Sequence, residues 1–375
     1  MSKATAASIS SAQRGVNIFN AARNHASNEY IEATRQVDVS TSISHAMKPI
    51  VEYGPFMNQF LRYVVNKIVI QSVESKMYNN PFSMLKGEDV PLGTDIERNY
   101  INPAMGRDYD ISLGSQLLNV TKPDVKTCYF RMNRQRQFPI TIPNELMRGA
   151  FTRWEELDAM VAGMIQSLYS GNQIEEENLV KKLLTSSVAD EVVIKKEIDY
   201  DEADPAASSV NFIKTVQKLA LDMPHSTAKF NNYQAYAKAN GITDATPAVT
   251  WTLPEDLYLF IRTDVLTDCN VETLAGAFNM SKAELVGRLA PLPDFSYLDF
   301  DSAVDPTTNY WKTIADNNDI LGILCDVRTF EYHDILTVSG DFYNAAGMYT
   351  NQFFNVWQTY GVRPWGNCVA ICKKK

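Results

Sequence analysis

The sequence predicts an α+β fold, with a sheet that is backed by one long helix and closed by the last strands of the chain. Three patterns carry this prediction. Apolar residues recur every three or four positions over 145–170, and they alternate with polar residues over 126–142 and again over 349–357, before the apolar run 367–372. Because the last strands need an apolar cover, the long helix is expected to supply it, with a second α/β lobe inserted between the two.

The helical pattern is the clearest signal in the sequence. A start signal lies at 143–145, and the Gly-Asn pair at 171–172 is typical of a helix end. A helix of about 26 residues would be roughly 40 Å long, and a second helix is expected over 174–186. The apolar stripe, which includes Trp154 and Leu157, lasts only about three heptads, which favours a helix packed on a sheet over a free coiled coil.

The alternation over 126–142 predicts a strand with one apolar face, and two arginines are out of character on it. Arg134 and Arg136 are in phase with the apolar residues of that face. A charge in a buried face is costly unless it is paired. Two interpretations stay open: an exposed end of the strand, or a carboxylate supplied by another subunit.

Two segments look unlike parts of a compact core. Residues 1–28 carry three basic residues and no acidic one, and they are rich in Ser, Ala and Asn. They are interpreted as a mobile or extended arm without a periodic core element, with a helix near 12–25, that gains order only from neighbours. Residues 79–125 hold many turn formers and little periodicity, which indicates an excursion whose contacts lie elsewhere.

Shorter patterns predict the other elements. Helices are expected at 54–67, 209–221, 229–239 and 271–278, strands at 68–73, 192–198, 256–262 and 319–325, and a boundary in the acidic loop 199–207.

The composition of the 375-residue chain excludes several classes of protein. Apolar residues make up 45% and charged residues 21%, as in ordinary globular proteins and unlike disordered ones. The net charge of −9 argues against a general nucleic-acid binder, because phosphate binding needs a concentrated basic surface. The five scattered cysteines are expected to be buried free thiols in a reducing cytoplasm. The sequence predicts neither a secretion signal nor a membrane span.

The search for catalytic motifs is negative. The sequence has no phosphate-binding loop, no dinucleotide fingerprint, no metalloprotease motif and no serine-hydrolase elbow. Its four histidines are far apart, and the acidic clusters at 197–204 and 299–305 lack the Gly and Glu of a calcium loop. No catalytic residue, cofactor or metal site is predicted, and an enzyme is the weaker class of hypothesis.

Four stretches together resemble one known family. They are NNPF…KG…VPLGTDIERNY at 79–100, VKTCYFRMNRQ at 125–135 with its Asn133-Arg134-Gln135 triplet, ETLAGAFNMSKAELVG at 272–287, and FFNVWQTYGVRPWGNCVAI at 353–371. In this order they make the chain similar to the major capsid proteins of small phi-29-like podophages (the picovirus group), which adopt the Hong Kong 97-type capsid fold. No single stretch is a catalytic signature.

The resemblance implies a domain map. It places an N-terminal arm at 1–50, a peripheral domain with the long spine helix at 51–78, 141–207 and 336–375, an extended loop at 79–140 that reaches over a neighbouring subunit, and an axial domain at 208–335. Some relatives carry an immunoglobulin-like domain after the last capsid strand, and none is expected here.

The resemblance also implies a function. The chain is expected to be a bacteriophage head protein that assembles from pentamers and hexamers into an icosahedral or prolate shell around double-stranded DNA, which it holds without sequence specificity. A scaffolding protein and a portal are the other expected partners. Assembly is expected in the host cytoplasm and the final location in the virion.

Eight residues are candidates for contacts in such a shell. The expected subunit-interface residues are Arg134, Arg136, Arg131, Asn133 and Lys86, and the arginines expected to face inward or to bridge subunits are Arg14, Arg23 and Arg35. Arg134 is expected to pair with a carboxylate of an adjacent subunit, for which Glu97 and the acids of 197–204 are candidates.

Two rival functions remain. The first is an encapsulin-like nanocompartment shell of the same fold, which would hold a cargo enzyme in place of DNA. The second, from another class, is a soluble α/β enzyme. Gel filtration separates the enzyme from the shells, because only a shell protein should form very large species.

Overall fold

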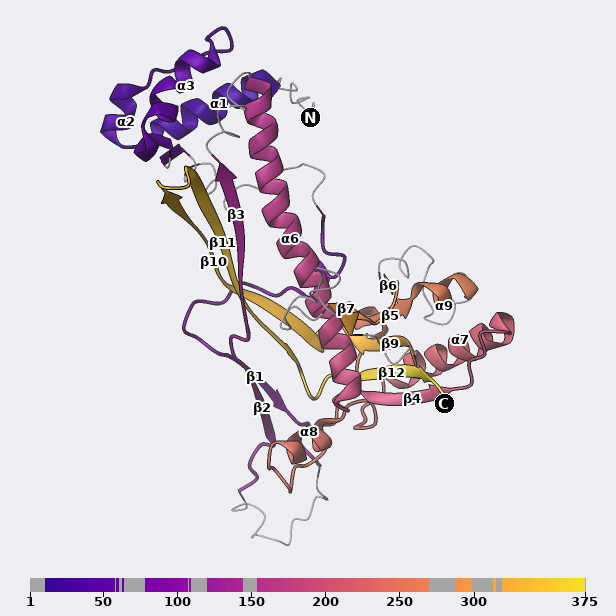
Figure 1. The fold of residues 1–375 in the computed structure, drawn as a ribbon. Helices are drawn as coiled ribbons and strands as arrows, with labels where there is room; N and C mark the ends of the chain where they lie inside the picture. The colour runs from indigo at the N-terminus through magenta and orange to yellow at the C-terminus, as the bar shows by residue number, and fades with distance from the viewer. Residues whose placement is uncertain are drawn as a thin grey trace, which may run out of the picture. The chain divides into compact units, whose positions relative to one another are not determined.

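The computed structural model describes most of the chain (Figure 1). The described residues are 11–57, 59–60, 63, 78–106, 108, 120–143, 154–269, 288–298, 313–314 and 319–374. The strand expected at 68–73, the helix expected at 271–278, the end of the helix expected at 54–67 and the side chains of Trp154 and Leu157 lie outside this description.

The chain folds into two compact units. Unit 1 comprises Met1–Asn80, Arg134–Glu175 and Asp334–Gln358, and unit 2 comprises Pro81–Asn133, Glu176–His333 and Thr359–Lys375.

Unit 1 begins with three helices, α1 (Ser11–Asn24), α2 (Asn28–Ala33) and α3 (Ile43–Glu52). The helix expected near 12–25 is thus confirmed. Figure 1 shows the three helices gathered at one end of the sheet of this unit.

The N-terminal helices contribute to a hydrophobic core, so the expectation of an arm without core residues is wrong. Buried side chains from α1, α2 and α3 pack in one cluster with side chains of the sheet and the long helix: Val16, Phe19, Ala22, Tyr30, Met47, Ile142, Leu168, Phe354 and Val356. Only three apolar residues of α1, Val16, Phe19 and Ala22, are fully buried, and they lie among polar residues. Because so short a stripe gives little periodic signal, the sequence pattern did not reveal it.

The sheet of unit 1 has the order β10-β11-β3. Its strands are β3 (Arg134–Pro143), β10 (Phe330–Asn344) and β11 (Tyr349–Val362), and the register of the antiparallel pair β11 and β3 places Phe354 opposite Phe138. The alternation predicted at 349–357 is confirmed as β11, whereas β10 was not predicted.

The strand expected over 126–142 is in fact two strands. β2 (Val125–Phe130) pairs with β1 (Ile96–Ile101) in unit 2, and β3 pairs with β11 in unit 1. Residues 131–133 separate them. The alternation continues across the break, so periodicity alone could not reveal it.

The long helix α6 (Trp154–Ala189) is continuous over 36 residues, so the predicted stop at Gly171 is wrong. A glycine inside a helix costs only about 1 kcal/mol, which tertiary packing can offset. The Gly171 position faces the Phe138 ring, where a Cβ would lie 3.5 Å from a ring carbon. α6 thus combines the two helices that were expected separately.

Unit 2 is built on a five-stranded mixed sheet with the order β4-β12-β9-β5-β6. The strands are β4 (Ile194–Ile198), β12 (Cys368–Lys373), β9 (Ile320–Asp326), β5 (Leu257–Arg262) and β6 (Leu289–Leu292). The strands predicted at 192–198, 256–262, 319–325 and 367–372 are confirmed.

Both faces of the central strands β12, β9 and β5 are buried. Leu257, Leu259 and Ile261 pack on one side with α7 (Pro205–Asp222), the helix predicted at 209–221. Phe260 packs on the other side with the end of α6. This burial explains why these strands are continuous apolar runs. The five cysteines of the chain are buried and free, as predicted.

Short elements complete unit 2. They are the 3-10 helices η1 (Ser83–Leu85) and η3 (Pro254–Asp256), the helices α8 (Tyr233–Ala239) and α9 (Thr263–Asp268), and the paired strands β7 (Tyr297–Leu298) and β8 (Thr313–Ile314). In the part of the chain that the structure describes, no helix has the length and apolarity that crossing a bilayer requires.

Candidate subunit interface

The hairpin β1–β2 has two different faces. Its inner face, with Ile96, Cys128 and Phe130, packs against Tyr233 and Trp365. Its outer face consists of Glu97, Asn99, Ile101, Val125, Thr127 and Tyr129. Ile101 lies opposite Val125, and both are exposed. Strand alternation therefore leaves an apolar pair uncovered on this face of the hairpin.

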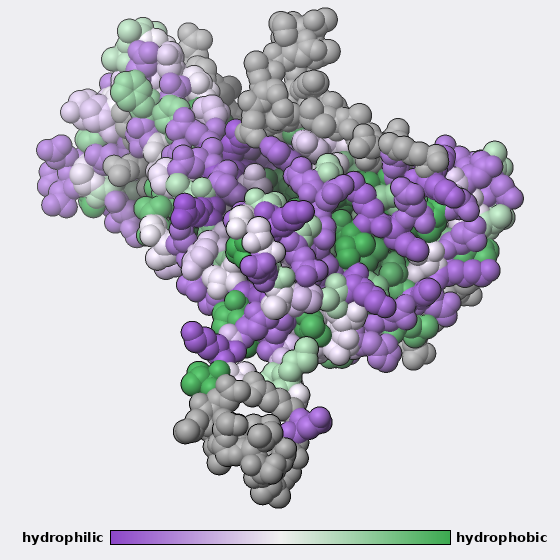
Figure 2. Space-filling model, turned by 90° about the horizontal axis from the view of Figure 1, so that it is seen from below, coloured by the Kyte–Doolittle hydropathy of each residue, from purple (hydrophilic) through white to green (hydrophobic). Residues whose placement is uncertain are grey.

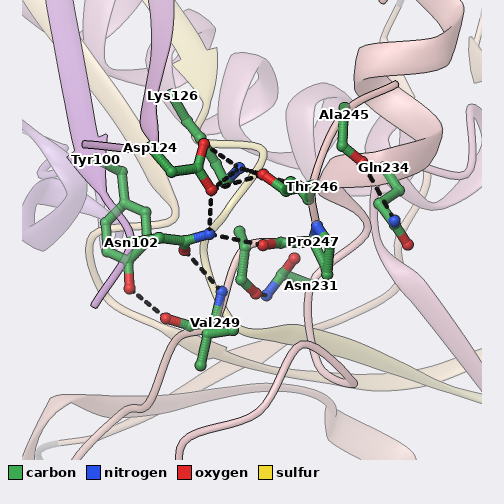
Figure 3. Close-up of polar contacts among 11 residues, drawn as sticks. Tyr100, Asn102, Asp124, Lys126, Asn231, Gln234, Ala245, Thr246, Pro247 and Val249 are labelled. Carbon is green, nitrogen blue, oxygen red and sulfur yellow. Dashed lines mark hydrogen bonds and ion pairs between the residues drawn. The ribbon is translucent and has the colours of Figure 1, made fainter. Parts of the chain in front are cut away.

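A polar network fastens the hairpin to the segment that follows α8 (Figure 3). The Asn102 amide donates to Asp124 Oδ2 at 2.6 Å and to the Pro247 carbonyl at 2.8 Å, and its Oδ1 accepts from the Val249 amide at 3.0 Å. Tyr100 donates its hydroxyl to the Val249 carbonyl. The hairpin therefore has its contacts within its own chain, and the expectation that the whole excursion 79–125 finds them elsewhere is wrong.

Lys126 is the buried charge of this network. Its ammonium donates to Asp124 at 3.2 Å and to the hydroxyl and carbonyl of Thr246 at 2.9 Å, and it lies 4.6 Å from the centre of the Tyr233 ring. The hydrogen bond from Thr246 is the largest factor that holds the pKa of Asp124 below its usual range. The network thus pairs its buried charge, as a low-dielectric site requires.

A second cluster lies where the loop joins the rest of unit 2. Glu331 accepts two hydrogen bonds from Arg98, at 3.0 and 2.9 Å, and two from Arg363, at 3.1 and 2.7 Å. Burial by itself would raise the pKa of Glu331, but the hydrogen bonds from His333, Arg363 and Arg98 hold that pKa well below its usual range. The carboxylate is therefore ionised and links β1, β10 and the turn after β11.

The predicted residues at the two ends of the loop are tied to neighbouring strands. Lys86 is exposed, and its backbone bridges to Tyr332. The Arg131 carbonyl accepts from the Thr359 hydroxyl at 2.7 Å, while its exposed guanidinium pairs with Asp95 at 3.2 Å. Asn133 and the backbone of Tyr360 exchange two hydrogen bonds, at 2.8 and 3.0 Å. Asn133 thus holds the chain in place at the break between β2 and β3.

Arg134 finds its carboxylate within its own chain. The residue is only 6% exposed, and its guanidinium pairs with Glu175 at 3.0 Å, donates to Asn172 at 3.3 Å and also donates to Gln358. Arg136 pairs with the same Glu175 at 3.3 Å. The expectation that Arg134 pairs with a carboxylate of an adjacent subunit is therefore wrong. Its partner is Glu175 of the same chain, and not Glu97 or one of the acids of 197–204.

The three N-terminal arginines differ from one another. Arg23 donates to the carbonyls of Thr34 at 2.9 Å and Ile31 at 3.0 Å, so it closes the C-terminal end of α2. Arg14 and Arg35 are exposed. Arg23 therefore stabilises a helix end within its own chain. The contacts of all three arginines in an assembly stay a prediction.

Large apolar side chains are exposed on both units. In unit 2, Met105 is 90% and Val120 is 81% exposed, and in unit 1, Phe342 and Met348 near the β10–β11 turn are also exposed. Figure 2 shows hydrophilic residues over most of the face seen from below, with apolar ones between them. Apolar side chains that are exposed singly are normal on a protein surface, so these four are not by themselves evidence of an interface.

A metal-binding group of side chains would be one mark of an enzyme site. Within the described ranges, no group of three or more His, Cys, Asp or Glu side chains is placed to hold a metal ion. The two charged clusters, around Asp124 and Glu331, escaped sequence reasoning because each joins segments that are far apart in the chain. Thr246 follows Asp124 by 122 residues, and Glu331 follows Arg98 by 233. No local pattern could have revealed them.

Known proteins resemble this chain in sequence and in fold. The family model of the Phi29-like phage major capsid protein matches residues 19–372. The major capsid protein of Bacillus phage PZA is 24% identical over 84% of this chain and 63% of its own length, and that of Bacillus phage B103 is 23% identical over 94% and 72%. The chain thus spans less than two thirds of the PZA protein.

Two solved structures show the fold. The capsid structure of Staphylococcus phage Andhra has a TM-score of 0.63 at 12% identity, over 81% of this chain and 88% of its own. A structure of the head fibre and inner core protein of bacteriophage P68 has a TM-score of 0.56 at 13% identity, over 80% and 87%. The predicted α+β phage capsid fold is confirmed by this likeness. With a family match over almost its whole length, the chain belongs to the Phi29-like phage major capsid protein family.

Proposed function

We propose that this chain is the repeating subunit of a phage head, and that many copies close into an icosahedral or prolate shell around double-stranded DNA. The observation that carries the proposal is the family match over residues 19–372. Its mechanism is geometric and needs no turnover. Contacts too weak to hold a single pair of subunits add up when each subunit meets several neighbours in a closed shell.

The outer face of the β1–β2 hairpin is the surface that we assign to a neighbouring subunit. Its inner face is already packed on unit 2, and its polar network fixes the hairpin in place. The apolar pair of Ile101 and Val125 and the exposed Tyr129 remain on the other side. In this proposal the loop 79–140 reaches its neighbour through the braced hairpin of β1 and β2. A braced hairpin loses less conformational entropy on association than a free arm would.

The other predicted surfaces fit the same assembly. The axial domain at 208–335 would meet its copies around pentamer and hexamer axes, and the peripheral domain at 51–78, 141–207 and 336–375 would carry the exposed Phe342 and Met348 to another contact. The segment 1–50 would meet neighbours through the outer surface of α1–α3. Lys86 and Arg131, which are exposed, are the basic interface candidates of the loop, and the exposed Glu97 lies on the outer face of the hairpin.

The charge of the chain supports a container for DNA. With a net charge of −9, a shell wall would repel the phosphate backbone and let packed DNA slide during filling and exit. The exposed Arg14 and Arg35 would be local exceptions that face inward or bridge subunits. A scaffolding protein and a portal would be further partners, with assembly in the host cytoplasm.

The rival functions have less support. A nanocompartment shell would need a cargo enzyme, and a soluble enzyme would need a catalytic site. Family membership favours neither of them.

Sedimentation velocity and electron microscopy of the full chain, produced alone and together with its phage's other head proteins, test the proposal. We expect particles far larger than a hexamer, and nuclease-resistant DNA in particles recovered from infected cells. A monomer or dimer under every one of these conditions would overturn the shell. Particles filled with a protein cargo and free of DNA would favour the nanocompartment.

A further inference from the structure

His333 lies at the root of the loop, where two segments of unit 2 meet. It is 4% exposed and belongs to β10, next to the Glu331 cluster. Its Nδ1 is 2.8 Å from the backbone carbonyl of Glu88, and its Nε2 is 3.3 Å from Glu331 Oε2. Both ring nitrogens therefore face oxygen atoms.

These two oxygen atoms determine the protonation state of the ring. A backbone carbonyl can only accept a hydrogen bond, so Nδ1 must carry a proton. The Glu331 carboxylate is held ionised by Arg98 and Arg363, so it can only accept as well, and Nε2 must also carry a proton. A neutral imidazole has only one N–H group, and it would turn a lone pair toward one of these oxygens. The geometry is thus that of an imidazolium.

The loop leaves the body of the unit at the same place. The Gly87 amide donates to the Tyr332 carbonyl at 2.9 Å, and a Cβ on Gly87 would collide with the His333 ring. Only glycine lets the ring come this close to the chain and reach the carbonyl of Glu88. The ring, Gly87 and Glu88 therefore form one closed contact at the first residues of the loop.

We propose that His333 is a proton-operated latch that closes the root of the loop when it is charged and loosens it when it is neutral. The charged ring bridges the Glu88 carbonyl to Glu331, and Arg98 ties the same carboxylate to β1. When the ring loses one proton, one of the two bridging hydrogen bonds is lost. The donor of the remaining hydrogen bond is then a neutral ring. Whichever hydrogen bond is lost, the ring no longer bridges Glu88 to Glu331, while the Gly87 amide keeps its hydrogen bond to the Tyr332 carbonyl.

The direction of the pH dependence follows from the groups around the ring. The hydrogen bond to Glu331 raises the pKa of His333, while burial and the charge of Arg98 oppose this shift, and the Glu88 carbonyl supports it. Arg363 on the turn after β11 and Cys128 on β2 lie by the same carboxylate. Because the pKa is raised in the closed state, the latch is fully closed below the ordinary histidine pKa of about 6.5 and loosens as the pH rises through the raised value.

A consequence for assembly rests on the proposed function. The hairpin can dock on a neighbour in one orientation only while its root is closed. Neutral His333 would therefore leave the hairpin attached to unit 2 but less uniformly oriented, which would slow shell closure at alkaline pH.

Histidine NMR of the unassembled full chain tests the protonation state directly. With selectively ¹⁵N-labelled histidine, the four side chains give four titrations, and the spectrum of His333→Gln assigns the one that belongs to His333. We expect His333 to be doubly protonated at pH 6.5 and to lose its second proton only above the ordinary histidine pKa. A neutral ring at pH 6.5 would overturn the latch, and the titration itself is measured on the wild-type chain.

Hydrogen–deuterium exchange tests the loosening. After correction for the intrinsic pH dependence of exchange, protection of residues 86–101 should fall severalfold between pH 6 and pH 9. In His333→Gln, protection should be low and independent of pH. His225→Gln, which changes an exposed histidine of the same unit, is the control and should behave as the wild type. Equal protection at pH 6 and pH 9 in the wild type would overturn the proposal.

The outcome for the latch is separable from the outcome for the shell. Both measurements use the unassembled chain and report on the root of the loop alone. Failure to form particles with an intact latch would count against the proposed function, and normal particles with a pH-independent root would count against the latch.

Discussion

At the residue scale, two buried charges of this chain, those of Arg134 and Glu331, are neutralised by partners that lie far away in its own sequence. Arg134 is in phase with an apolar face, so the sequence correctly indicates that it needs an acceptor. The acceptor, Glu175, lies on α6, and Gln358 on β11 completes the site. A pattern of alternation says which side of a strand a residue occupies, but it cannot say which element or which chain covers that side.

Replacement of Arg134 should therefore destabilise the single subunit. Arg134→Glu would set a carboxylate against Glu175 in a buried site, and the loss of a buried pair costs about 3–5 kcal/mol. The melting temperature of the unassembled chain should fall by several degrees. Arg131→Glu is the matched control, because the Arg131–Asp95 pair is exposed and should change the free energy of unfolding by no more than about 1 kcal/mol. A wild-type melting curve for Arg134→Glu would show that the internal pair carries no stability.

Glu331 should make the stability of the subunit sensitive to acid. Because the folded state lowers its pKa, the carboxylate adds stability above the unfolded value of about 4.3, and this stability is lost as the pH falls toward the lowered value. Urea unfolding at several pH values between 3 and 7 should show a shallower pH dependence for Glu331→Gln than for the wild type. Glu97→Gln changes an exposed carboxylate of the adjoining hairpin and is the control. Parallel curves for wild type and Glu331→Gln would contradict this assignment.

At the scale of elements, the long helix α6 shows that tertiary packing can override a local sequence signal for a helix end. A Gly-Asn pair is a good helix end, yet α6 passes through it without interruption. Gly171 is covered by Phe138, and the Asn172 side chain accepts from Arg134. Tertiary contacts from β3 therefore hold both residues in the helix.

Replacement of Gly171 by alanine should stabilise the chain. A Cβ at this position would lie 3.5 Å from the Phe138 ring, an ordinary contact, and a helical alanine loses less backbone entropy than glycine. We expect Gly171→Ala to raise the free energy of unfolding by about 0.5–1 kcal/mol. Gly361→Ala is the contrasting control, because its Cβ would collide with the Phe130 ring and should destabilise the chain. A loss of stability in Gly171→Ala would mean that the helix is broken at this point.

The N-terminal helices should behave as part of the folded unit. Phe19 on α1 is fully buried in the core of unit 1, so Phe19→Ala should cost about 3–5 kcal/mol. Thermal unfolding followed by circular dichroism measures this cost. Asn17→Ala, on the exposed side of the same helix, should leave the melting temperature nearly unchanged. Equal melting of both variants would restore the interpretation of this segment as a free arm.

At the scale of the whole molecule, the sequence predicts what local patterns can encode. The strands at 256–262, 319–325 and 367–372 are predicted because both of their faces are buried, which produces continuous apolar runs. The break at 131–133 is not predicted, because the alternation crosses it unchanged. Nor is β10, whose alternation is weak beyond its buried first residues. The charged clusters at the loop are not predicted either. As for Arg134 and its partner, only the fold brings the segments of each cluster together.

The central claim is that copies of this chain meet through the outer face of the β1–β2 hairpin in a closed shell. A cryo-electron microscopy reconstruction of particles formed by the chain tests it most directly. The account predicts closed shells in which Ile101, Val125 and Tyr129 are covered by an adjacent copy, while the inner face keeps its contacts with Tyr233 and Trp365. Shells that leave this outer face in solvent, or a chain that forms no shell with its phage's other head proteins present, would contradict it.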